Sequence, residues 1–179
     1  NYNDLFIGDK NAIMIAARIL SYGSSYEFDH DGVRQDIDLG KFEIKDLHPD
    51  FEKAETNEFS FKLPHSNNEI TFKLLTHGDE KIIDEELKGL KKINKFSSND
   101  VTARLAHLLT SINGSREKKD IREFVNNYFL AKDSRAFRKY YSTVSPDIDM
   151  NVTLIDSDSV EEEATLPIGI NFFWPDAWV

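Results

Sequence analysis

The first apolar stretch lies between Asp9 and Tyr22, where hydrophobic residues occur on nearly every side of a helix. An acidic residue stands in its first turn, and Gly23 follows it directly, as expected for a helix C-terminus. A helix that is apolar all round has to be covered on most sides. We therefore predict a buried N-terminal helix.

A strand-rich region over residues 24–76 follows, because apolar residues alternate with polar ones there. The alternation is clearest in Phe59–Leu63 and Ile70–Leu74, which are separated by the polar turn Ser66–Asn68. A weaker hairpin is centred on Asp31-Gly32, since glycine supplies the positive φ that such turns require. Both patterns predict antiparallel hairpins.

Residues 79–145 have apolar positions three and four residues apart, which predicts four helices. The best-patterned helix extends from Val101 to Ile112 and stops at Asn113-Gly114. Asp133 is expected to cap the last helix. The apolar positions of the other three helices are Ile83, Leu87 and Leu90, then Ile121, Phe124, Val125, Tyr128 and Phe129, and finally Phe137, Tyr140, Tyr141 and Val144.

Residues 148–179 return to strand spacing and end in an aromatic tail. Met150–Leu154 and Ala164–Ile168 form the expected closing hairpin, joined by an acidic turn over Asp156–Glu163. Antiparallel hairpins from both ends of the chain, a central four-helix segment and a buried N-terminal helix indicate the α+β class. Since no repeat or Gly/Pro-rich linker interrupts the sequence, we expect a single domain over residues 1–179.

Composition and charge limit the function. The 179 residues are 40% hydrophobic and carry 22 basic and 32 acidic side chains, a net charge of −10, which argues against a general nucleic-acid binder. Cysteine is absent, so thiolate chemistry and thiolate metal sites are excluded. Neither a long apolar run nor a basic leader is present, and we expect a soluble, intracellular protein without membrane contacts.

The densest polar cluster comprises Asp29, His30, Asp31, Asp36 and Asp38, and carboxylates of this kind could hold a hard cation. A metal-dependent hydrolase is therefore one alternative function. Ordinary turn chemistry is the favoured interpretation, because no second histidine accompanies the cluster. His65 and His77 border the same hairpin and are interpreted as surface residues beside turns.

Sequence motifs for catalysis or for phosphate binding are absent, so neither an enzyme nor a cofactor is predicted. A small basic and aromatic patch, formed by Arg135–Lys139 with Tyr140 and Tyr141, leaves a nucleic-acid module as a third hypothesis. The net charge makes it the least favoured of the three.

The aromatic C-terminus, residues 167–179, is the most unusual feature, because chain ends are commonly polar. It either docks on its own core or anchors a partner, since buried Trp and Phe dominate interface energetics. The predicted partner-binding residues are Phe172, Phe173, Trp174, Pro175 and Trp178.

Several segments, taken in order, resemble the baseplate-hub proteins of T-even-like contractile-tailed bacteriophages. They are Leu5–Lys10, Ala16–Gly23, Tyr26–Phe28, Asp38-Leu39, Leu63-Pro64, Lys73–Thr76, Gly78–Glu80, Ser111–Gly114, Ala131–Arg138, Pro146–Asp149 and Leu166–Pro175. The Asp-Ser-Arg helix start at Asp133 and the Phe-Phe-Trp-Pro ending are the most specific of them.

The resemblance implies a role in building the central hub of the viral baseplate, in the host cell cytoplasm, through contacts with other hub proteins. An assembly factor, which acts as a chaperone and leaves, is favoured over a structural subunit that stays in the tail baseplate. The partners, the stoichiometry and the oligomeric state are left open.

Many members of this family carry paired C-P-x-C-G knuckles at two hairpins, which correspond to Phe28–Gln35 and Leu154–Glu161. This chain has Asp, His and Ser there, so turn chemistry and packing are expected to replace a zinc staple. Relatives also begin with an additional N-terminal region, and the start at Asn1 is therefore interpreted as a truncation.

Overall fold

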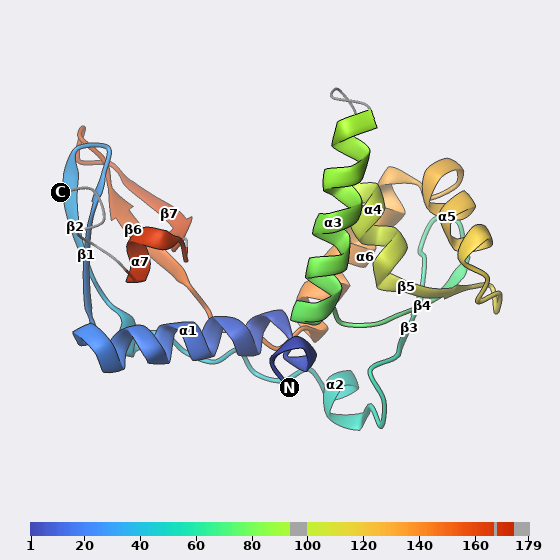
Figure 1. The fold of residues 1–179 in the computed structure, drawn as a ribbon, viewed down its shortest axis with the longest axis horizontal. Coiled ribbons are helices and arrows are strands. Elements are labelled where there is room, and N and C mark those ends of the chain that lie inside the picture. Colours follow the sequence, from blue (N-terminus) through green and yellow to red (C-terminus); the bar gives the residue numbers. More distant parts are fainter. Residues whose placement is uncertain (94–99, 167, 174–179) are drawn as a thin grey trace. The chain divides into compact units, whose positions relative to one another are not determined.

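The computed structural model describes residues 1–93, 100–166 and 168–173 and confirms the α+β class (Figure 1). Helices alternate with three small antiparallel sheets, ordered β1-β2, β3-β4-β5 and β6-β7. The elements in chain order are η1 (Tyr2–Asp4), α1 (Ile7–Tyr22), β1 (Ser25–His30), β2 (Val33–Asp38), η2 (Leu39–Lys41), α2 (Pro49–Lys53), β3 (Phe59–Lys62), β4 (Glu69–Phe72), α3 (His77–Ile93), α4 (Asp100–Leu108), β5 (Leu109–Ile112), α5 (Lys118–Asn127), α6 (Ala131–Val144), β6 (Asn151–Ile155), β7 (Glu161–Thr165) and α7 (Ile170–Phe173).

The chain forms two compact units. Unit 1 comprises Asn1–Ile7 and Leu47–Ser145, and unit 2 comprises Gly8–Asp46 and Pro146–Val179. Each unit has its own cluster of buried apolar side chains. The sequence predicts a single cooperative domain over residues 1–179. The division into two units does not test that expectation, which stays a prediction.

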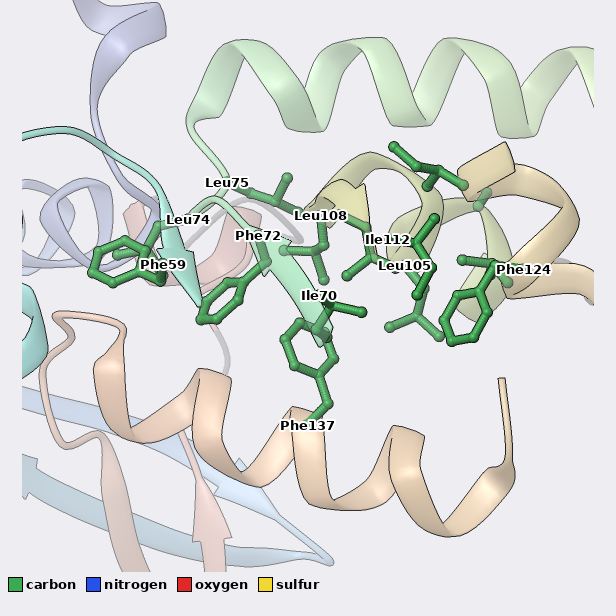
Figure 2. Close-up of a cluster of buried hydrophobic side chains, with 14 of the residues drawn as sticks. Phe59, Ile70, Phe72, Leu74, Leu75, Leu105, Leu108, Ile112, Phe124 and Phe137 are labelled. Carbon is green, nitrogen blue, oxygen red and sulfur yellow. The ribbon is translucent and has the colours of Figure 1, made fainter. Parts of the chain in front are cut away.

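The core of unit 1 lies between the sheet β3-β4-β5 and the four predicted helices α3 to α6. Ile70 and Phe72 of β4 are almost completely buried, and the Phe72 ring meets the Phe137 ring of α6 edge-on at 5.1 Å (Figure 2). Alternation along β3 and β4 places Phe59 with these rings and turns Ser60 to the opposite face. The hairpin predicted from this alternation is confirmed.

The predicted helix over Val101–Ile112 extends too far at its C-terminal end, and this part of the prediction is wrong. α4 ends at Leu108, and Leu109–Ile112 forms β5, which pairs with β4. Asn113 and Gly114 then turn with φ of 47° and 84°, as expected for a chain reversal. The apolar spacing fits a helix or a strand here, and backbone pairing with β4 decides between them.

A reciprocal cap starts α3. The Thr76 backbone N–H donates to Asp79 Oδ2 at 3.0 Å, and the Asp79 N–H donates to Thr76 Oγ1 at 3.3 Å. Lys73 Nζ lies 2.5 Å from the same carboxylate. Burial would raise the pKa of Asp79, but the hydrogen bonds from Lys73 and Thr76 lower it below its ordinary value.

Asp133 joins α6 to the loop between β3 and β4. Its fully buried carboxylate accepts the backbone N–H groups of His65 at 2.8 Å and Ser66 at 3.0 Å. It does not cap the helix as expected, because α6 begins at Ala131 with Leu130 at the N-cap position. The carboxylate is instead used by a loop more than sixty residues earlier in the chain.

Unit 2 contains two hairpins. The turn of β1-β2 is formed by Asp31 and Gly32, with φ of 48° and 78°, which confirms the predicted hairpin. The β6-β7 hairpin is also confirmed, although the returning strand starts at Glu161 inside the segment expected to be a turn. The pairing of Ile155 with Glu161 decides this boundary.

Helix α1 of unit 2 forms as predicted, but the expectation that it is buried all round is wrong. Within it only Gly8, Ile15 and Arg18 are buried. Gly8 allows a close approach of the chain, since a Cβ there would lie 1.9 Å from the Pro146 carbonyl oxygen. Asn11 Nδ2 donates to Asp147 Oδ1 at 3.3 Å beside it. One side of the helix thus packs on Pro146-Asp147.

Candidate functional site

The other side of α1 presents an exposed row of apolar side chains, here called the α1 stripe: Ile13, Ala16, Ala17 and Leu20. Their spacing of three, four and seven residues places them on one helix face. Ile13 is 50% exposed and Leu20 is 88% exposed. No charged residue lies within the stripe, which extends about 10 Å along the axis. Such a face fits contact with another apolar surface.

The sequence contains a signal for this surface. A helix that is apolar all round has more apolar surface than one small unit can cover. The sequence pattern by itself, however, predicts that all of this surface is buried. In the structure, Leu39, Ile148 and Leu166 pack with Ile15 on one side only. The face that is left over forms the stripe.

The aromatic tail begins inside the core of unit 2. Phe172 is fully buried, and its ring lies 5.0 Å from that of Tyr26 and 5.2 Å from that of Phe173. This is the docking on its own core that the sequence left open for the tail. Phe173 is partly buried, whereas Trp174, Pro175 and Trp178 lie outside the described residues. Partner binding by these tail residues stays a prediction.

The carboxylates of the proposed cation cluster have separate roles. Asp36 Oδ1 accepts a hydrogen bond from the Ser25 hydroxyl at 2.7 Å, and Asp38 Oδ1 accepts one from the Gly40 backbone N–H at 3.0 Å. Asp29 and Asp31 are exposed. Among the residues that the structure describes, no three His, Cys, Asp or Glu side chains gather as metal ligands.

The two hairpins of unit 2 are joined by side chains at the positions where the resemblance puts the zinc knuckles. Gln35, 7% exposed, donates from Nε2 to the Ile155 carbonyl at 2.8 Å and accepts the Ile155 N–H at 3.2 Å. His30 Nε2 lies 2.6 Å from Glu162 Oε1. The side-chain amide of Gln35 therefore bonds to the β6 backbone as a neighbouring strand would. The contact between His30 and Glu162 links β1 to β7.

His65 and His77, which border the same hairpin in the sequence, make separate contacts in the structure. The backbone of His65 bonds to Asp133, and the ring of His77 packs against Tyr2 at 4.5 Å. In the basic and aromatic patch, both tyrosines are also engaged: Tyr140 donates to Asp50 at 2.5 Å, and Tyr141 accepts the Leu75 N–H at 3.2 Å. Burial, together with the bond to Asp50, raises the pKa of Tyr140 to about 12.

A groove of about 480 Å³ in unit 1 lies between α3, α4 and α5, with Ile82, Leu109 and Ile121 among its apolar lining. Its rim carries basic side chains, most of which are held by acidic neighbours: Lys73 by Asp79, Arg116 by Glu58 and Arg122 by Glu86. Hydrogen bonds from Arg116 and Thr110 lower the pKa of Glu58. These pairs leave little positive charge for an anionic ligand.

The described residues thus define an α+β protein of two units, in which the most exposed large apolar side chain, Leu20, lies on a face of α1. Within that part of the chain, no helix is long and apolar enough to cross a membrane. No known protein family, curated protein or solved structure matches this chain. The likeness to baseplate-hub proteins accordingly stays a prediction.

Proposed function

We propose that this protein acts by binding other proteins during assembly of the baseplate hub of a contractile-tailed bacteriophage, in the host cell cytoplasm. The α1 stripe is the observation that carries the proposal. An exposed apolar stripe of this kind favours contact with an apolar surface of a partner, because removing its side chains from water is favourable. The occupant is another hub protein.

In each unit, a segment that carries the family resemblance packs against a distant part of the chain. Gly8 and Asn11 in the first third of the chain approach Pro146-Asp147 in the last third. Asp133 binds the two residues that follow Pro64. The first contact lies within unit 2 and the second within unit 1, so each unit uses such segments for its own packing.

The test is co-purification with named hub proteins from infected cells. Ile13→Ser and Leu20→Ser in one variant remove apolar area from the stripe, and we expect loss of hub proteins from the complex. Because both side chains are at least half exposed, the free protein keeps its thermal stability. Ile82→Ser is the matched control, since Ile82 is 56% exposed on α3 of unit 1.

Equal recovery of hub proteins by the stripe variant and by the Ile82→Ser control contradicts the proposal. A second measurement separates the two roles considered. An assembly factor is absent from purified tails, whereas a structural subunit of the hub is present there in fixed ratio to the other hub proteins. We favour the assembly factor.

A further inference from the structure

The exposed side of α6 carries positive charge only. Four exposed basic residues share it and are here called the α6 basic face: Lys132, Arg135, Arg138 and Lys139. Helical spacing places them within about 120° of the helix circumference and along about 10 Å of its axis. Phe137 points from the other side of α6 into the core of unit 1 (Figure 2). Asp133, the one carboxylate of this helix, is fully buried and bound by the β3-β4 loop, so the exposed side has no counter-charge from α6 itself.

The other surface arginines of the described residues each pair with a carboxylate. The pairs are Arg34 with Glu27, Arg104 with Glu80, Arg116 with Glu58 and Arg122 with Glu86. In the α6 basic face, by contrast, no ion pair joins a side chain to a carboxylate of the described chain. Arg138 instead donates from Nε to the backbone carbonyl of Ser134 at 3.4 Å. The four charges are therefore unpaired within that part of the protein.

Unpaired positive charges at this spacing destabilise a helix. Arg135 stands three residues from Lys132 and from Arg138 and four from Lys139, and like charges three and four residues apart on a helix repel one another. Lys132 also lies in the first turn of α6, where the positive end of the helix dipole disfavours a cation. Local conflicts of this kind are expected where a surface is used for binding. An anionic partner removes the repulsion and supplies the carboxylates that the chain itself does not.

Carboxylates of a polypeptide match this surface better than the phosphates of a nucleic acid. Tyr140 and Tyr141 follow the basic residues, but neither is free for base stacking: the Tyr140 ring stacks on Phe61 at 4.7 Å, and the Tyr141 hydroxyl accepts the Leu75 N–H. Four cations are also fewer than the roughly six to ten phosphate contacts that give strong binding to DNA. The net charge of −10 repels a long polyanion, whereas a short acidic segment meets less repulsion.

We propose that the α6 basic face binds an acidic peptide segment of a partner protein. About three or four acidic residues in extended chain cover its length, since each residue spans about 3.3 Å. Arginine can hold each carboxylate through two parallel hydrogen bonds. This inference is independent of the α1 stripe, because it depends on charge in unit 1 and the stripe depends on apolar contact in unit 2. Either surface can fail its test without the other.

The test measures the fluorescence anisotropy of a labelled peptide of ten glutamates at pH 7 and low salt. We expect the wild type to bind this peptide, and a variant with Arg135→Glu and Lys139→Glu to bind it at least about tenfold more weakly, because attraction becomes repulsion. Lys118→Glu with Lys119→Glu is the matched control, since both lysines are exposed on α5 of the same unit and the net charge changes equally. This control loses less than about twofold, because salt screens exposed charges outside the binding surface.

Equal affinity of the two variants for the peptide, or no binding by the wild type, overturns the proposal. A labelled thymidine decamer tests the other class of partner: tighter binding of the decamer than of the peptide, lost in the α6 variant, identifies a nucleic-acid surface and overturns the proposal as well. Thermal unfolding checks that the variants fold, as expected for changes at exposed side chains. Should the α6 variant fail to fold, Arg135→Gln with Lys139→Gln decides instead, with an expected loss of affinity of about three- to tenfold.

Discussion

At the scale of single residues, Asp133 shows how much one side chain contributes to unit 1. It is completely buried, and its two oxygens accept backbone N–H groups from the loop between β3 and β4. Hydrogen bonds to a charged acceptor are stronger than neutral ones, and an unsatisfied buried N–H is costly. The residue therefore fixes the position of the β3-β4 loop.

We predict that Asp133→Asn lowers the free energy of unfolding by about 2 to 4 kcal/mol. The amide has one accepting oxygen, and its NH2 group cannot accept the second backbone N–H. Urea denaturation followed by far-UV circular dichroism measures the loss. Asp84→Asn is the control, since Asp84 is exposed on α3. Similar midpoints for the two variants would contradict the role assigned to Asp133.

The same carboxylate makes stability depend on pH. Burial alone would raise the pKa of Asp133, but hydrogen bonds from Ser66 and His65 lower it below its ordinary value. A carboxyl with a lowered folded-state pKa stabilises the fold above the unfolded value of about 3.9, and this contribution disappears as the pH falls further.

We therefore expect the stability difference between wild type and Asp133→Asn to be constant from pH 7 to pH 5 and to shrink below about pH 4. Urea midpoints at pH 7, 5, 4 and 3 test this. A stability difference that grows on acidification would contradict a pKa of Asp133 that is lower in the folded state than in the unfolded state. Local sequence patterns contain no sign of this coupling, because the loop and the carboxylate are far apart in the chain.

At the scale of elements, the packing of α1 depends on a glycine. Gly8 lies in its first turn, where a Cβ would come within 2.6 Å of the Asp147 Cα atom and still closer to the Pro146 carbonyl. Both neighbours are backbone atoms, which cannot rotate away as a side chain can. The approach of α1 to residues 146–147 thus needs the absence of a side chain.

We predict that Gly8→Ala destabilises unit 2 by about 2 to 3 kcal/mol, through forced separation of these segments. Gly89→Ala provides a matched comparison in α3, where an added Cβ meets nothing within 4 Å. That variant gains up to about 1 kcal/mol from helix propensity. Thermal unfolding of both proteins checks the opposite signs, and a gain for Gly8→Ala would refute the close approach.

At the scale of the whole molecule, each unit has its own buried cluster. Phe137 belongs to one cluster and Leu39 to the other, and both are almost fully buried. Independent cores can unfold independently, in which case different probes give different midpoints. Amide hydrogen exchange distinguishes the two cores, because α3 to α6 belong to unit 1 and the hairpins β1-β2 and β6-β7 belong to unit 2.

We predict that Phe137→Ala lowers the stability that hydrogen exchange measures for α3 to α6 by about 3 to 5 kcal/mol and leaves that of the two unit 2 hairpins unchanged. Leu39→Ala is expected to do the reverse, with a loss of about 2 to 5 kcal/mol. If both variants shift both signals together, the chain unfolds as the single cooperative domain expected from its sequence.

Local patterns in the sequence determined the α+β class, the four central helices and the hairpin turn at Asp31-Gly32, because spacing and turn chemistry act over a few residues. Tertiary structure alone decided that Leu109–Ile112 is a strand, that Asp133 serves a distant loop and that one face of α1 stays uncovered. The physical reason is the same in each case: these outcomes depend on partners that are distant in the chain and adjacent only after folding.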